Sequence, residues 1–149
     1  MYFVDQEKID QTLFYMDQML NTYENNSFNT HVEQLAIERI VHMTIESIID
    51  VGNMMIDGFI MRDPGSYDDI IDILIDEKVI PEHDEDSYKS IIALRHMLVR
   101  NYSNVNHKEL VEIMDQQINT LKNFSKHVFA YLEKEMGPIT AFKKREGEV

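Results

Sequence analysis

Three helix-start signals constrain the fold of this chain more than any other sequence feature. Each is a serine, threonine or asparagine followed three residues later by an acidic residue and then by an apolar run; the pairs are Thr30–Glu33, Ser66–Asp69 and Asn106–Glu109. The first side chain of such a pair accepts a hydrogen bond from a free backbone N–H in the first turn of a helix. Because no sustained alternation of apolar and polar residues is found along the chain, the pattern predicts an all-α protein.

Apolar residues spaced by three and four define the helices between these signals. Five helices are predicted. The first covers residues 5–26, the second runs from residue 30 to the RDPGS segment (62–66), and the third covers residues 67–78. The fourth runs from about residue 84 to the YSNVN turn (102–106), and the fifth covers residues 106–136. Pro64 and Gly65 are expected to stop the second helix, and Gly137 and Pro138 the last. We expect a single four- to five-helix bundle over residues 1–138, followed by a charged, mobile tail over residues 139–149.

Composition narrows the classes of function. The chain has 149 residues and no cysteine, which excludes disulfides and thiolate zinc sites. Its 27 acidic and 14 basic residues give a formal charge of −13; this charge repels nucleic acid over the molecule as a whole, so DNA is not expected as a ligand and any RNA contact must be local. No basic leader precedes an apolar run, and no apolar stretch approaches the roughly 20 residues that span a bilayer. We therefore expect a soluble, cytoplasmic protein that does not bind membranes.

An arginine interrupts the apolar face of the fourth predicted helix. Ile91, Arg95, Leu98 and Tyr102 follow one another by four, three and four residues, so they lie nearly in line on a helix. An unpaired guanidinium is too costly to bury. Arg95 therefore either reaches the edge of the stripe or pairs with an acidic neighbour, or this face meets a second subunit and lines a cleft.

The segment RHMLVRNY at 95–102 resembles the motif of the HepT-like family, a branch of the HEPN helical-bundle proteins. In that motif an arginine and a polar residue are followed by three residues, a histidine, any residue and a tyrosine. Here Arg95, His96 and Tyr102 match, while Arg100 stands where the family has histidine. The segments AIERIVHMTIESIIDVGN, PGSYDD and YSNVNHKEL also follow the family pattern.

The resemblance implies a homodimer in which the motif residues of both subunits form a metal-independent ribonuclease site with no cofactor. It further implies a toxin whose antitoxin partner is a minimal nucleotidyltransferase that adenylylates the motif tyrosine. By this resemblance Arg95 stabilises the RNA phosphate, His96 orients it, and Tyr102 is the modification target. Such chemistry needs a base for the 2′-hydroxyl and positive charge for the phosphorane.

Arg100 changes that expectation, because a guanidinium does not exchange protons near neutral pH. With arginine at position 100 the site is expected to bind phosphate but not to carry out acid–base catalysis. Two histidines are alternatives: His96, four residues before Arg100, and His107, which has six residues between it and Arg100. We therefore predict a degenerate ribonuclease site with absent or very weak activity. The alternative is a non-catalytic dimeric module that binds a protein partner or a phosphate or nucleotide ligand.

A polar stripe at three- and four-residue spacing follows the second predicted helix; it comprises Arg39, His42, Glu46, Asp50, Asn53 and Asp57. One interpretation is a solvated helix face with intrahelical pairs. The other has Glu46 or Asp50 facing Arg95 across the bundle. His42 and Glu46 alone are too few ligands to predict a metal site, and we expect no metal.

Overall fold

The computed structural model describes residues 4–137, and these residues form helices and connecting turns without strands. The elements are α1 (Gln6–Glu24), α2 (His31–Gly58), α3 (Tyr67–Asp76), a short 3₁₀ helix η1 (Glu82–Asp84), α4 (Glu85–Arg100), α5 (His107–Lys122) and α6 (Phe124–Met136). The all-α prediction is confirmed. The predicted tail at residues 139–149 lies outside the described residues.

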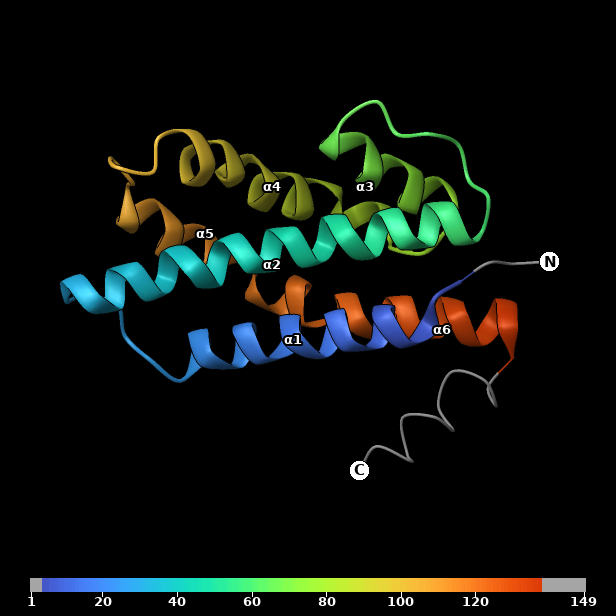
Figure 1. Cartoon of the computed structure of the whole chain (residues 1–149), viewed down its shortest axis with the longest axis horizontal. Helices are drawn as coiled ribbons and strands as arrows, with labels where there is room; N and C mark the ends of the chain where they lie inside the picture. Colours follow the sequence, from blue (N-terminus) through green and yellow to red (C-terminus); the bar gives the residue numbers. More distant parts are fainter. Residues whose placement is uncertain (1–3, 138–149) are drawn as a thin grey trace.

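Helix α2 is the central element of the bundle. It has 28 residues and contacts α1, α3, α4 and α5; Figure 1 shows it running through the middle of the molecule, between α1 on one side and α3 and α4 on the other. Its start is the predicted capping box: the Glu33 N–H donates to Thr30 Oγ1 at 3.2 Å, and Glu33 Oε1 accepts from the Thr30 N–H at 2.9 Å. The apolar stripe of α2 is buried along its whole length; its most enclosed members include Ile37, Val41, Ile45, Ile48, Val51 and Met55.

The other two predicted helix starts are also confirmed. Ser66 Oγ accepts from the Asp69 N–H at 3.1 Å at the start of α3, and Asn106 Oδ1 accepts from the Glu109 N–H at 3.1 Å at the start of α5. Asp5 caps α1 as expected, accepting from the Lys8 N–H at 3.0 Å. These local bonds fix where each helix begins.

Two predicted helix boundaries are wrong. Helix α2 ends at Gly58, before the RDPGS segment, because Ile60 adopts a left-handed conformation with φ of 56° and the Met61 N–H turns back to the Ile56 carbonyl at 2.9 Å. The predicted helix over 106–136 is divided into α5 and α6 at Asn123, whose N–H donates to the carbonyl three residues earlier, Thr120, at 3.1 Å. After this residue α6 takes a different direction from α5 (Figure 1).

Helix α3 packs closely on α2 because of Gly52. A Cβ atom on this buried glycine would lie 2.4 Å from Cγ2 of Ile70, which is itself buried. Real side chains do not approach this closely, so only glycine allows the two helices to pack at this distance. The close packing brings the start of α3 near the polar side of α2, where the site lies.

We expect Gly52→Ala to lower the free energy of unfolding by about 1–3 kcal/mol, the usual cost of overpacking a core, although alanine is the better helix former. Urea denaturation followed by circular dichroism measures the change. Gly65→Ala is the matched control, since the nearest atom to a Cβ there is Asp69 Oδ2 at 3.7 Å, an ordinary contact. Equal stability of the two variants would contradict the packing explanation.

Candidate functional site

The four motif residues of α4 and the following turn do not form one cluster within a single chain. Arg95 is partly buried and reaches α2, whereas His96 and Arg100 are exposed. Tyr102 lies in the turn after α4 and is 72% exposed. In the part of the chain that the structure describes, His96, Arg100 and Tyr102 make no hydrogen bond or ion pair. The 100° step between successive helical residues turns His96 away from Arg95, and Arg100, four residues after His96, lies on the same face of α4 as His96.

Arg95 is held by one residue from α2 and one from α3. Its Nε donates to Glu46 Oε1 at 2.7 Å, and its guanidinium carbon lies 4.6 Å from the centre of the Tyr67 ring, within the range of a cation–π contact. The side chains of Arg95 and Glu46 are each 27% exposed. The hydrogen bond to Glu46 is the main reason that the pKa of Arg95 is raised above its ordinary value. Thus an acidic neighbour explains the arginine in the apolar stripe, and of the two predicted candidates it is Glu46.

This arrangement leaves most of the guanidinium available. Glu46 is bonded to Nε, and within residues 4–137 neither Nη nitrogen of Arg95 makes a hydrogen bond. The two Nη groups carry four of the five N–H donors of an arginine and present the geometry that suits a carboxylate or phosphate. Arg95 is therefore oriented by the protein and retains donors for an anion.

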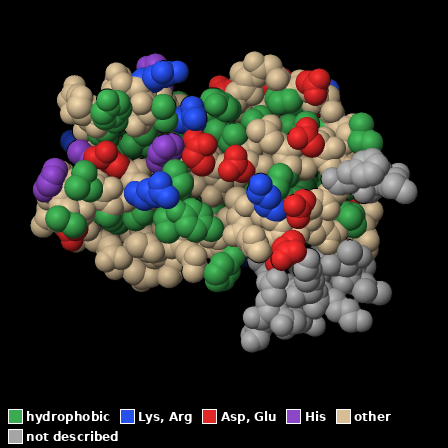
Figure 2. Space-filling view, in the orientation of Figure 1, with side chains coloured by type: hydrophobic (Ala, Val, Ile, Leu, Met, Phe, Trp, Pro, Cys, Tyr) green, Lys and Arg blue, Asp and Glu red, His purple; other side chains and the backbone are tan. Residues whose placement is uncertain are grey.

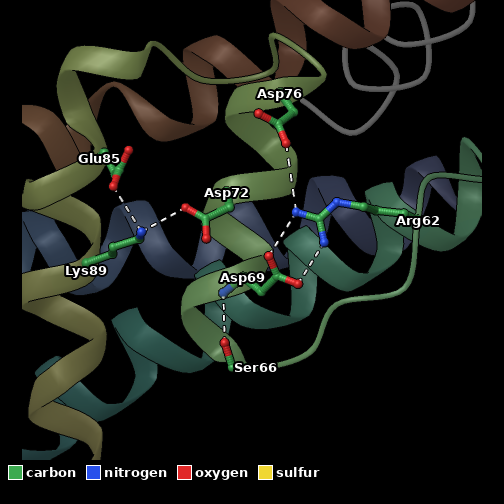
Figure 3. Close-up of polar contacts among 7 residues, drawn as sticks. All are labelled: Arg62, Ser66, Asp69, Asp72, Asp76, Glu85 and Lys89. Carbon is green, nitrogen blue, oxygen red and sulfur yellow. Dashed lines mark hydrogen bonds and ion pairs between the residues drawn. The ribbon is translucent and has the colours of Figure 1, made fainter.

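An ion-pair cluster fixes the start of α3, the helix that begins with Tyr67. Arg62 donates through both Nη atoms to the two carboxylate oxygens of Asp69, each at 2.8 Å, and the Gly65 N–H donates to the same carboxylate at 2.8 Å. Figure 3 shows Asp69 between Arg62 and the N-cap Ser66. These bonds, with that from Arg62 the largest cause, lower the pKa of Asp69 to about 2. These bonds hold the loop before α3 against that helix, whose first residue, Tyr67, contacts Arg95 through its ring.

A second ion-pair cluster joins α3 to α4. Lys89 Nζ lies 2.7 Å from Asp72 Oδ1 and 3.0 Å from Glu85 Oε2, as Figure 3 shows. Hydrogen bonds to these two carboxylates raise the pKa of Lys89. Tyr67 lies on α3, and Arg95 lies on α4 beyond Lys89. By joining these two helices, the cluster sets the position of Arg95 relative to Tyr67.

The polar stripe of α2 serves both predicted purposes. Arg39, Asp50, Asn53 and Asp57 are exposed, as expected of a solvated face. Glu46 instead faces α4, and His42 Nε2 lies 3.4 Å from the Glu46 oxygen that binds Arg95. Partial loss of hydration and the nearby negative charge of Glu46 raise the pKa of Asp50. The middle of the stripe therefore belongs to the site and the rest to the surface.

His107, the other histidine considered from the sequence, is already paired. It is the first residue of α5, and its Nε2 lies 2.7 Å from Glu38 Oε2 of α2. The pair links α5 to α2, and in the described chain His107 makes no hydrogen bond with Arg100. Its contact is with α2 and not with the motif.

Basic and titratable side chains concentrate at one end of the molecule. Figure 2 shows the histidines and most Lys and Arg side chains of this face on its left half, while most acidic side chains lie on the right. The left end in Figure 1 contains the start of α2, the end of α4 and the start of α5. A negatively charged protein thus carries a local basic region around the motif.

Two further properties hold for the described residues. No group of three or more His, Asp or Glu side chains there is arranged to hold a metal ion. None of the helices in residues 4–137 is long and apolar enough to cross a membrane.

Comparison with known families decides the classification. The family profile described as "Ribonuclease HepT-like" matches residues 9–128, which include α4 and the whole motif segment. This chain belongs to the HepT-like ribonuclease family. The HepT-like profile ends within α6, so it covers most of the bundle described above.

Known HepT-like relatives and related folds agree with this classification. A Bacillus subtilis (strain 168) protein named "Putative RNase YutE" is 46% identical over 144 residues, which are 96% of this chain and 100% of the relative. The solved structure of YutE, described as a cytosolic protein of unknown function, has a TM-score of 0.92 over 95% of this chain and 100% of its own. A tri-AMPylated Shewanella oneidensis HEPN toxin in complex with MNT antitoxin has a TM-score of 0.74 at 17% identity, covering 86% of this chain and 99% of its own. At that identity the likeness concerns the fold.

The sequence did not identify Tyr67 as a neighbour of Arg95. It is an aromatic residue directly after an N-cap, and nothing in its spacing connects it to Arg95. Its contact depends on the close packing of α3 on α2, which only the structure provides.

Proposed function

We propose that this protein is a toxin-type HepT-like protein, derived from a ribonuclease, whose site binds an RNA phosphodiester through Arg95 and Arg100. The observation that carries the proposal is the orientation of Arg95 by Glu46 and Tyr67 with both Nη groups left for an anion. Bidentate binding of a phosphate oxygen pair is the contact that such a guanidinium favours. The local basic region supports RNA binding by a protein whose net charge is −13. A cytoplasmic location is part of the proposal, supported by the description of YutE as cytosolic.

The proposed site is degenerate as a ribonuclease. Arg100 occupies the position where the family motif has histidine, and a guanidinium binds phosphate but does not transfer protons near pH 7. His96 is exposed and has no hydrogen-bond partner among the described residues, so nothing there orients it as a base. We therefore expect absent or very weak cleavage by the protein as it stands.

Arg100→His is expected to raise the rate of RNA cleavage more than any other single change, by about 10²–10⁴-fold, because it returns a general acid–base group to the motif position. Cleavage of an end-labelled RNA in the presence of chelator measures the rate. Arg100→Ala is the control, since it removes the same charge without adding a proton-transfer group.

The proposal fails if Arg100→His and Arg100→Ala behave alike, or if RNA binding is unaffected by Arg95→Ala. Robust cleavage by the unmodified protein that His96→Ala abolishes would instead restore full toxin activity to the motif. RNA or nucleotide binding with no cleavage by any of these variants would favour the second candidate, a non-catalytic dimeric binding module; Arg100 is the observation that favours it.

We also propose a homodimer with the α4 helices of both subunits near the two-fold axis. Large apolar side chains are exposed on the elements around the site; they include Phe14 of α1, Val32 and Leu35 of α2, and Tyr67 of α3. Such surface is commonly covered by a partner. Sedimentation velocity at micromolar concentration is expected to give a dimer, and a monomer there would contradict the proposal.

The proposed antitoxin partner is a minimal nucleotidyltransferase that modifies Tyr102. The phenol is 72% exposed, and an added phosphate would neutralise a nearby arginine. The S. oneidensis neighbour is described as AMPylated and in complex with its MNT antitoxin, which supports this assignment.

After co-expression with a nucleotidyltransferase encoded beside it, the protein is expected to gain the mass of one or more AMP groups, and Tyr102→Phe is expected to remove the gain. Tyr67→Phe is a matched control, because this tyrosine is also exposed but contacts Arg95 through its ring. Intact-mass spectrometry measures the outcome. Labelling that persists in Tyr102→Phe would refute the assignment.

A further inference from the structure

One histidine outside the motif segment reaches the motif arginine through a shared carboxylate. Glu46 Oε1 accepts from Arg95 Nε at 2.7 Å, and the same oxygen lies 3.4 Å from His42 Nε2. We call these three residues, His42 and Glu46 of α2 with Arg95 of α4, the α2–α4 triad. Their side chains are 32%, 27% and 27% exposed, so the triad is ordered by its neighbours and still open to a ligand.

We propose that His42 is the proton-transfer residue of this protein, replacing the motif histidine that Arg100 has displaced. The inference rests on the proposed function, because it requires an RNA phosphate at Arg95. Imidazole is the side chain that ordinarily exchanges protons near neutral pH, and the triad brings one to the arginine from a different helix. His42 thereby accounts for whatever cleavage the unmodified protein retains.

The other nearby histidines are less well placed. His107 Nε2 lies 2.7 Å from Glu38 Oε2, and Glu38 is not the carboxylate that binds Arg95. His96 lies next to Arg95 in the chain but is exposed and has no hydrogen-bond partner in residues 4–137. Of these three histidines, His42 is the one that shares a hydrogen-bonding oxygen with Arg95.

Glu46 acts as a positioning residue in this scheme. Its carboxylate fixes the Nε edge of Arg95, which leaves the Nη groups for the phosphate, and it keeps the His42 ring on the same side. A carboxylate that orients a catalytic imidazole is a recurring arrangement in acid–base catalysis. The close packing of α3 on α2 at Gly52 contributes by setting the Tyr67 ring against one face of the guanidinium.

The proposed step is an internal transesterification of RNA. The ribose O2′ forms a bond to phosphorus while the P–O5′ bond breaks, giving a 2′,3′-cyclic phosphate and a 5′-hydroxyl. With His42 Nε2 directed at the Glu46 carboxylate, the 2′-hydroxyl proton passes to the other ring nitrogen, His42 Nδ1, and the departing O5′ takes a proton from water. The resulting hydroxide removes the proton from His42, so no proton is gained or lost overall. Arg95 neutralises the additional negative charge on the phosphorane.

Single-turnover cleavage of an end-labelled RNA, with protein in excess and chelator present, tests the proposal. We expect slow cleavage by the unmodified protein, a rate about 10²–10⁴-fold lower for His42→Ala, and partial recovery of His42→Ala with added imidazole. His42→Gln, which keeps a polar contact to Glu46 without transferring protons, is expected to be as slow. The control His83→Ala changes an exposed histidine of η1 and is expected to cleave like the unmodified protein.

Binding of a 2′-O-methyl RNA analogue, which lacks the nucleophilic 2′-hydroxyl and cannot be cleaved, is measured in parallel by fluorescence anisotropy. We expect His42→Ala to bind within about twofold of the unmodified protein, because removing proton transfer leaves the Arg95 contact in place. Arg95→Ala is expected to weaken this binding. The binding measurement tests the proposed function separately from the role of His42.

Several results would overturn the inference while leaving phosphate binding intact. They are no detectable cleavage by the unmodified protein despite binding of the analogue, an unchanged rate in both His42→Ala and His42→Gln, or a loss in His42→Ala that imidazole does not restore. Loss of analogue binding in His42→Ala with a native circular dichroism spectrum would also overturn it, since His42 would then act in binding. Failure of the unmodified protein to bind the analogue would refute the proposed function itself.

Discussion

Burial of the apolar stripe of α2 is the constraint on which the rest of the structure depends. Four helices contact α2, and each fully buried isoleucine, valine or methionine on it contributes about 1.5–3 kcal/mol relative to exposure. Because other helices pack around α2, its polar residues can lie only in the narrow strips of its surface that these helices leave uncovered. Glu46 lies in such a strip beside Ser47 and Ile45, both buried, and this places its carboxylate against α4.

The arginine on α4 follows from the same constraint. An arginine facing a fully apolar helix would be excluded by the cost of desolvating its charge, but Arg95 meets the strip that contains Glu46 and the ring of Tyr67. The pair remains about one quarter exposed, so that neither charge is fully removed from water. Stability and access to a ligand are therefore compatible at this position.

The helices were predictable because local sequence signals mark where they begin. Two interruptions were not predictable, because no sequence signal marks them. At each of the caps formed by Thr30, Ser66 and Asn106, the side chain accepts a hydrogen bond from the backbone N–H three residues later, and all three bonds are present. The break at Asn123 was missed because Leu121 and Phe124, three residues apart and both buried, continue the helical spacing across it. The early end of α2 was missed because a left-handed isoleucine is uncommon.

The candidate site was predictable in part for a related reason. The family motif pointed to Arg95, and helix periodicity reduced its partner to Glu46 or Asp50, but the choice between them depends on how α4 is rotated against α2. Tyr67 had no such periodic relation, since its position depends on the packing of α3. His42 was visible as a neighbour of Glu46 on one helix, and only the Glu46 oxygen that it shares with Arg95 connects it to the motif.

The contacts of Tyr23 affect the order in which the bundle is completed. This residue of α1 is buried, and its hydroxyl donates to the Val111 carbonyl and the Asp115 carboxylate of α5, far away in the sequence. Helices α1 and α2 are neighbours in the chain and pack together as an antiparallel hairpin, so their contacts are local in sequence. The partners of Tyr23 leave the ribosome much later, because most of the intervening chain must be made first. Until α5 has been synthesised, the Tyr23 region of α1 therefore lacks its partner, and uncovered apolar surface of this kind favours aggregation.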